Sequence, residues 1–171
     1  NGASRHSRLN AALSVAAAIY CGCPLSNIKK RLKFIDLPER RLAISNSLKG
    51  SILIDDSYNS NPASLKNAVD SLEGLKRKKV CILGDMKELG SDSQKIHQEM
   101  YEYISERVDQ IFCIGDEWST CSPNEKKDLS IFENQDDLYS HLISIIDKKT
   151  ILLVKGSRST RMDLLADKLK E

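Results

Sequence analysis

The sequence predicts an α/β fold in which helices cover both faces of a mostly parallel sheet. Strand-like and helix-like segments alternate from residue 51 to the end of the chain, and this alternation is the pattern of a parallel sheet. The strand cores 80–83 and 151–154 are continuously apolar, as strands buried on both faces must be. Hydrophobic residues make up 40% and charged residues 29% of the 171 residues, which is typical of one globular domain with a core.

Two helices are predicted before the sheet. Apolar residues recur at helical spacing over 9–20, and Gly22 with Pro24 ends this helix. Residues 25–34 have the pattern of a second, shorter helix. We place the boundary between the helical part and the sheet part at 37–40, where the apolar period changes.

A hairpin opens the sheet part. Residues 41–48 and 51–55 are predicted strands, and Lys49 with Gly50 joins them as a tight turn would. The remaining elements are predicted as helix 62–75, strand 80–83, helix 93–108, strand 110–114, a weak strand 129–132, helix 136–146, strand 150–154 and helix 160–170.

Charge and hydropathy exclude some partners. The first 50 residues carry nine Lys and Arg against two Asp and Glu, although the net charge of the chain is only +2. These cations lie in helical patterns without interleaved aromatic residues, so a phosphate-bearing small ligand or a solvated face is favoured over nucleic acid. The longest apolar stretch, 11–23, is shorter than the roughly 20 residues of a membrane-spanning helix, so no membrane partner is expected.

The five cysteines are odd in number and include no CxxC pair. Cys21, Cys81 and Cys113 lie in apolar runs, where a thiol acts as a small hydrophobic group. We therefore expect a cytoplasmic, reduced chain with neither a disulfide framework nor a zinc site.

Candidate ligand-binding loops follow the predicted strands. In an open α/β sheet, ligands bind at the carboxyl ends of the strands, where loops turn into helix N-termini. The loops 55–62, 84–90, 115–118 and 155–161 each join Gly or small polar residues to at least one charged residue.

The first loop begins with the pair Asp55 and Asp56. An aspartate leaving a buried strand can accept hydrogen bonds from a ribose diol or lie near a metal ion; the alternative is an exposed carboxylate that caps a turn. Asn61 and Pro62 are expected to begin the next helix, as N-cap and first helical residue.

The last loop places Lys155, Arg158 and Arg161 near a predicted helix N-terminus. Cations are unfavourable there unless an anion lies among them, so the loop predicts an anion site, with a solvated basic turn as the alternative. The hydroxyl groups of this loop, those of Ser157, Ser159 and Thr160, are candidate caps of the helix.

The second loop carries Asp85, Lys87 and Glu88, and His97 follows in the next helix. No Ser or Cys nucleophile is placed beside this histidine, and a lone His on an amphipathic helix is more often a surface or core-edge residue than a base. The chain contains neither GxxxxGK[ST] nor GxGxxG, the two common nucleotide phosphate motifs.

Taken in order and spacing, four segments resemble the Mur ligases: 5–13, 55–62, 84–90 with His97, and 153–162. The resemblance covers essentially the whole chain. It implies a family of three domains, of which residues 1–38 would be the helical tail of the central ATPase domain and residues 39–171 the Rossmann-like C-terminal domain.

The resemblance also implies a reaction and its partners. The family forms amide bonds with ATP and Mg²⁺: a peptide carboxylate becomes an acyl phosphate, and an amine then attacks it. The segments are most similar to the member that joins D-alanyl-D-alanine to UDP-N-acetylmuramoyl tripeptide in peptidoglycan precursor synthesis. Mg²⁺ would be held mainly by the preceding domains and no metal ligand is assigned here. We expect this fragment to bind ATP weakly and not to turn it over without its own N-terminal and central domains.

Site residues follow by matching positions. The resemblance implies that Asn10 contacts adenine, that Arg41 reaches the ATP phosphates and acts in catalysis, and that Asp56 contacts the ribose with Tyr58 and Asn59 beside it. Ser7 stands where the family commonly has Asn, and Arg40 is a neighbouring candidate for the phosphate contact. The resemblance further implies that one loop binds the incoming amino acid's carboxylate, through Lys155, Ser157, Arg158, Ser159 and Thr160.

Two other functions remain open at this point. The chain could belong to another Mur ligase or to a folylpolyglutamate synthase-like ligase. It could also be a non-enzymatic α/β binding module, such as a receiver-like domain that uses Asp55, Asp56 and Lys155.

Overall fold

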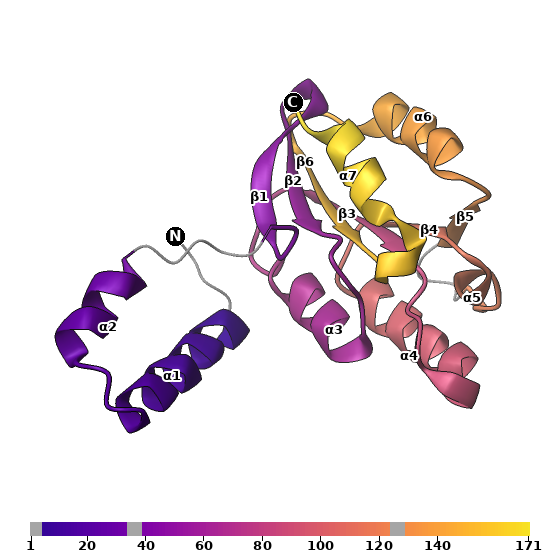
Figure 1. Cartoon of the computed structure of the whole chain (residues 1–171). Helices are drawn as coiled ribbons and strands as arrows, with labels where there is room; N and C mark the ends of the chain where they lie inside the picture. Colours follow the sequence, from indigo (N-terminus) through magenta and orange to yellow (C-terminus); the bar gives the residue numbers. More distant parts are fainter. Residues whose placement is uncertain (1–4, 34–38, 124–128) are drawn as a thin grey trace. The chain divides into compact units, whose positions relative to one another are not determined.

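The computed structural model describes residues 5–33, 39–123 and 129–171, the first three of them by backbone alone. The chain divides into two compact units, Asn1–Pro38 and Glu39–Glu171. Figure 1 labels their helices and strands. The predicted boundary at 37–40 lies partly outside the described residues, as does the last residue of the predicted helix 25–34.

The first unit is a pair of helices, α1 (Arg5–Tyr20) and α2 (Leu25–Leu32), so both predicted helices are confirmed. Gly22, with φ of +79°, lies in the turn between them. Of the large apolar side chains described in this unit, Ile28 is buried. The exposed ones are Leu9, Leu13, Ile19, Tyr20, Leu25 and Leu32.

The second unit is built on a six-stranded sheet with the order β1-β2-β6-β3-β4-β5. The strands are β1 (Ala43–Ser47), β2 (Ser51–Asp56), β3 (Lys78–Gly84), β4 (Gln110–Ile114), β5 (Leu129–Phe132) and β6 (Thr150–Lys155). Among the strands that the structure describes, only β1 runs antiparallel, paired with β2 as the predicted hairpin, and the other neighbours are parallel. The predicted mostly parallel sheet is confirmed.

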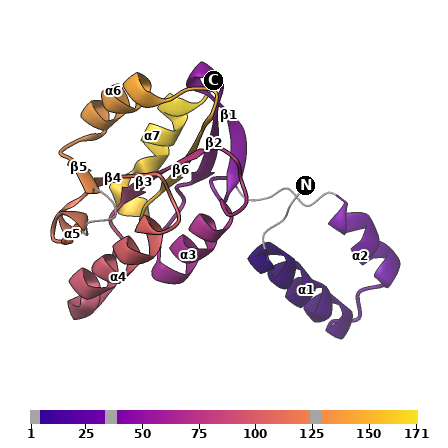
Figure 2. The same ribbon diagram turned by 180° about the vertical axis from the view of Figure 1, so that it is seen from behind.

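Helices cover both faces of this sheet, as predicted (Figures 1 and 2). The helices are α3 (Pro62–Asp70), α4 (Ser93–Ser105), α5 (Asp116–Ser119), α6 (Gln135–Ile145) and α7 (Met162–Leu169). One core cluster joins Cys81 and Leu83 of β3 to α3, α4 and α5, and the other joins Val80 and Ile82 to α6 and α7. Successive β3 residues thus enter opposite cores, which explains the continuously apolar strand.

Some predicted bounds were wrong. The helix predicted for 62–75 ends at Asp70, because a turn containing Gly74 at φ +77° follows. The helix predicted to start at residue 160 starts at Met162, because Arg161 adopts the left-handed conformation (φ 51°) after a 3₁₀ turn over Arg158–Thr160. The segment 116–119, predicted as loop, forms the short helix α5.

The cysteine prediction was correct in part. Cys81 and Cys113 are buried, whereas Cys21 is exposed at the end of α1, and Cys121 is buried although its sequence context is polar. Among the described helices, none is long and apolar enough to cross a membrane.

Candidate functional site

The loops singled out in the sequence converge at one edge of the sheet. The parallel strands β2, β6, β3 and β4 are neighbours and therefore end at the same edge. Asp56, the last residue of β2, is directly opposite Lys155, the last residue of β6. Leu83 of β3 is opposite Lys155 on the other side. The β2–α3, β6–α7 and β3–α4 loops thus start side by side, as Figure 1 shows.

Asp56 and Lys155 form a buried ion pair. Lys155 Nζ lies 2.6 Å from Asp56 Oδ2, with side-chain exposures of 2% and 12%. Asp56 Oδ1 accepts a hydrogen bond from the backbone N–H of Leu42. Burial raises the pKa of the Asp56 carboxyl and lowers the pKa of the Lys155 ammonium, because removal from water disfavours the charged form of each group.

Asp55 is also buried, at 1% exposure, and belongs to a different network. Its Oδ1 accepts from the backbone N–H and the hydroxyl of Ser57, and its Oδ2 lies 3.0 Å from Lys170 Nζ. Both aspartates are buried, so the exposed carboxylate of the alternative interpretation was wrong, but Asp55 does cap a turn through the N–H of Ser57.

The structure distinguishes Arg40 from Arg41. Arg40 donates to the backbone carbonyl of Asp163 and to the carboxylate of Asp167, so its guanidinium is bound to α7. Arg41 is exposed, and its guanidinium stands 4.5 Å from the centre of the Tyr58 ring. Of the two arginines, only Arg41 therefore presents its charge at the strand-end edge, where Tyr58 is 48% exposed.

The two residues before the α3 cap lie differently. Asn59 is exposed, and its backbone carbonyl accepts from Lys155 Nζ at 2.7 Å. Ser60 is buried, and its backbone carbonyl accepts from the Ser157 hydroxyl at 3.4 Å. The predicted cap is confirmed: the Asn61 side chain accepts from the N–H of Ser64, the Ser64 hydroxyl accepts from the N–H of Asn61, and Pro62 opens the helix.

Ser157 joins three loops. Its N–H donates to the carbonyl of Asp85, and its hydroxyl oxygen accepts from the N–H of Lys87 at 2.8 Å. The same hydroxyl donates to Ser60. The sequence indicated Ser157 for its hydroxyl but not for its role in connecting these loops. Nothing in the local sequence indicates contacts with residues 70 and 97 positions away.

Small residues let these loops approach one another. A Cβ on Gly84 or on Gly156 would lie 2.5 Å from Thr160 Oγ1, and the Cβ on Gly156 would also lie 3.0 Å from Gly84 Cα. The backbones of Gly84 and Gly156 therefore lie in close contact, and the Thr160 side chain packs against both. Thr160 Oγ1 itself donates to the carbonyl of Ser157.

The three cations of the last loop all lie near carboxylates, so they do not require a ligand anion, and an anion site at this loop stays a prediction. Asp163, three positions beyond Thr160, lies 3.4 Å from Arg158 and 3.3 Å from Arg161, and Lys155 is paired with Asp56. These carboxylates compensate the charges of the three cations. The sequence indicated this for the two arginines, because Asp163 is close to both of them along the chain. The predicted caps were wrong, because α7 begins without a side-chain cap. Arg158 and Ser159 remain exposed on this loop.

The β3–α4 loop is ordered by buried groups. Asp85 is 3% exposed, and its carboxylate lies 2.8 Å from Lys87 Nζ. His97 is fully buried: its Nε2 accepts from the N–H of Met86, and its Nδ1 lies 2.8 Å from the carbonyl of Ser93. Because Nε2 accepts from Met86, Nδ1 is the ring nitrogen that donates, to the Ser93 carbonyl. The prediction of a surface or core-edge histidine was therefore wrong, and His97 is a buried residue that orders this loop.

Two predicted groups belong to the helical unit. Asn10 is exposed on α1 in the helical unit, where its backbone carbonyl accepts from the Ser14 hydroxyl. The side chain of Ser7 lies outside the described residues. Within the described residues, no group of three or more His, Cys, Asp or Glu side chains is arranged to hold a metal ion.

The domain is an α/β domain with a mostly parallel sheet. Its carboxyl edge, where such sheets commonly bind ligands, carries carboxylates, cations and an exposed aromatic ring. Residues 40–158 match the family model described as "Mur ligase, glutamate ligase domain". The chain therefore belongs to the Mur ligase family, as its motifs indicated.

Individual relatives agree with this family. The chain is 32% identical to the UDP-N-acetylmuramoyl-tripeptide--D-alanyl-D-alanine ligase of Haemophilus influenzae, over 97% of this chain and 37% of that protein. A crystal structure of MurF from Acinetobacter baumannii superposes with a TM-score of 0.84 at 31% identity, over 98% of this chain and 38% of that one. A MurF ligase from Thermotoga maritima in complex with ADP has the same fold, with a TM-score of 0.80 at 22% identity over 96% and 38% of the two chains. The chain thus spans little more than a third of these proteins.

Proposed function

We propose that this chain is part of an ATP-dependent ligase that joins D-alanyl-D-alanine to UDP-N-acetylmuramoyl tripeptide in peptidoglycan precursor synthesis. Residues 39–171 supply its C-terminal domain, and residues 1–38 are the helical tail of its central ATPase domain. Membership of the Mur ligase family and the printed name of the Haemophilus influenzae relative support this proposal.

The position of Arg41 is the main observation that supports nucleotide binding by this domain. Its exposed guanidinium stands over the half-exposed Tyr58 ring, beside the buried pair of Asp56 and Lys155. A cation, an aromatic face and the exposed amide of Asn59 fit a nucleoside phosphate, since each offers a contact to phosphate, base or sugar. Arg41 would meet the ATP phosphates and stabilise charge that develops during phosphoryl transfer.

The acceptor end would be the β6–α7 loop. Arg158 and Ser159 are exposed there and can contact the carboxylate of the incoming D-alanyl-D-alanine. Lys155, Ser157 and Thr160 already bond within the protein, so they would shape the loop that offers this contact. The amine of the dipeptide must be neutral when it attacks the acyl phosphate, because an ammonium has no lone pair.

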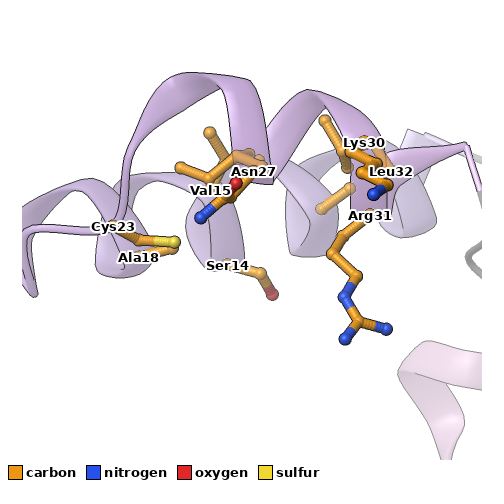
Figure 3. A pocket seen from close by; sticks show the side chains of 10 residues that line it. Ser14, Val15, Ala18, Cys23, Asn27, Lys30, Arg31 and Leu32 are labelled. Atoms are coloured by element: carbon orange, nitrogen blue, oxygen red, sulfur yellow. The ribbon is translucent and has the colours of Figure 1, made fainter.

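The helical unit supports its assignment to a larger domain. A helix that is apolar on several sides is normally buried, yet α1 exposes Leu9, Leu13 and Tyr20. A groove of about 800 Å³ between α1 and α2 is lined by Val15, Ala18 and Leu32 among others (Figure 3). The rest of a central ATPase domain would cover these surfaces, and Asn10 would contact adenine from this side.

Mg²⁺ supplies neutralisation of phosphate charge when bound in such a reaction. In this proposal the Mg²⁺ ligands belong mainly to the preceding domains, as the family resemblance implies. A cytoplasmic location is part of the same proposal, because ATP and the UDP-linked precursor are cytoplasmic substrates.

A binding and turnover assay tests the proposal. The 171-residue chain is expected to bind ATP weakly and to hydrolyse none of it. Turnover by this chain alone would contradict the division of the active site between domains. Acceptor choice is tested in a chimera in which residues 1–171 replace the matching part of the Haemophilus influenzae relative, with that unmodified relative as control. The chimera should use D-alanyl-D-alanine, and preference for a single amino acid would overturn the substrate assignment.

A further inference from the structure

Lys155 is a buried amine whose contacts are all internal. Its side chain is 2% exposed, and its Nζ lies 2.6 Å from Asp56 Oδ2 and 2.7 Å from the Asn59 carbonyl oxygen. An ammonium has three N–H donors, and two of them are used in these bonds. Since so little of the side chain reaches the surface, Lys155 is poorly placed to bind a substrate carboxylate.

Both groups that accept hydrogen bonds from Lys155 lie where β2 leads into the β2–α3 loop. Asp56 is the last residue of β2, and Asn59 follows in the loop, with Tyr58 between them. Lys155 lies at the end of β6, 99 positions from Asp56 along the chain. Its ammonium therefore connects Asp56 and Asn59 to the neighbouring strand β6. These two bonds fix the backbone between them, which includes Tyr58.

Two further bonds extend this arrangement to Arg41. Asp56 Oδ1 accepts from the N–H of Leu42, and the N–H of Tyr58 donates to the carbonyl of Arg40. Leu42 and Arg40 both have positive φ, at 53° and 59°, so contacts must hold this segment in a conformation that side chains disfavour. Lys155 thus fixes the position of the Asp56 carboxylate, and Asp56 in turn fixes the backbone of the segment that contains Arg41.

We propose that Lys155 is a positioning residue for nucleotide binding, which acts through Asp56 and Asn59 and does not contact the acceptor. The proposal rests on the function proposed above. Lys155 immediately precedes the β6–α7 loop, which is proposed to bind the dipeptide. In this proposal its side chain nevertheless serves nucleotide binding.

The test compares three variants of the 171-residue chain. Lys155→Met removes the ammonium and keeps the length of the side chain, Asp56→Asn removes the partner charge, and the third variant combines both. Lys168→Met is the matched control, because Lys168 Nζ also lies 2.6 Å from a carboxylate, that of Asp136, but on the surface. Amide hydrogen exchange, thermal unfolding and ADP affinity are measured for each.

Lys155→Met is expected to speed exchange of the Leu42 and Tyr58 amides at least tenfold, while the β6 amides Leu152 and Leu153 change by less than twofold. ADP affinity should fall at least tenfold in Lys155→Met and in Asp56→Asn. The combined variant should bind no more weakly than the weaker single variant, because both changes break one pathway. Lys168→Met should change none of these values.

Unchanged exchange at Leu42 and Tyr58 in Lys155→Met would overturn the proposal, whatever the ADP result. If Lys155→Met alone fails to fold because it leaves Asp56 buried and unpaired, the combined variant leaves no such charge and is measured in its place. Protection of the two amides at the wild-type level in the combined variant would equally overturn it. Failure of the wild-type chain to bind ADP would count against the proposed function, whereas the exchange result would still decide the role of Lys155.

Discussion

The Asp85 carboxylate packs directly against the backbone of Gly115. A Cβ on Gly115 would overlap Cγ and both carboxylate oxygens of Asp85, and Gly115 has φ of +128°, which side chains rarely adopt. Asp85 Oδ1 also accepts from the N–H of Trp118 at 3.4 Å, so the end of β4 is fitted around this buried carboxylate.

Gly115→Ala is therefore expected to destabilise the chain by about 2–4 kcal/mol, because it combines steric overlap with backbone strain. Gly74→Ala is the matched control: Gly74 also has positive φ, at +77°, but a Cβ there would meet nothing within 4 Å. Its cost should be about 1 kcal/mol. Urea unfolding measures both, and equal costs for the two variants would show that Asp85 does not press on Gly115.

Thiol reactivity should divide the cysteines into two groups. Cys21 and Cys23 are exposed. Burial raises the pKa of Cys81 to about 12 and that of Cys121 to about 11, and it also raises the pKa of Cys113. Since the thiolate is the reactive form, the last three should react with a thiol reagent at pH 8 only after unfolding. Rapid modification of more than two thiols in the native chain would contradict the described packing.

Replacing each arginine of the 40–41 pair should give different results. Arg40→Ala loses contacts with Asp163 and Asp167, so it should cost about 1 kcal/mol of stability, a modest value because the guanidinium is partly exposed. Arg41→Ala should change stability by less than about 0.5 kcal/mol and should weaken ADP binding. Denaturant unfolding and ADP titration measure the two effects. The reverse pattern would assign the ligand contact to Arg40.

Stability should depend on Asp167 at acid pH. The hydrogen bond from Arg40 holds the pKa of the Asp167 carboxyl below its ordinary value of 3.8. A group whose pKa is lower in the folded state stabilises the fold above its unfolded pKa, and this contribution is lost as the pH falls through the folded pKa. The difference in unfolding free energy between wild type and Asp167→Asn should therefore shrink from pH 6 to pH 3. A difference that grows with acidification would reverse the sign of this coupling.

The sheet was predictable because its strands have local signatures. Residues 80–83 and 151–154 are apolar without interruption, and Asn61 followed by Pro62 announces the start of α3. Helix ends were less predictable. Helix α7 begins two residues later than predicted, because Arg161 adopts the left-handed conformation. An arginine at this position does not indicate that conformation.

The candidate site was predictable as a set of loops and less so as a set of contacts. Strand ends gather by topology, so Asp56 and the 155–161 loop could be placed at one edge from sequence alone. The pairing of Lys155 with Asp56 depends on β6 inserting beside β2, a non-local register. The binding of Arg40 to α7, which leaves Arg41 as the exposed arginine, depends likewise on contacts more than 120 positions apart along the chain.

In the proposed complex the nucleotide lies over Arg41, Asp56 and Tyr58 at the carboxyl edge of the sheet. Backbone amide NMR of the 171-residue chain, titrated with ADP to millimolar concentration, tests this placement. Shift changes are expected in residues 41–42 and 56–60, and Arg41→Ala should weaken them. Changes confined to the opposite edge of the sheet, or none at saturating ADP, would contradict it.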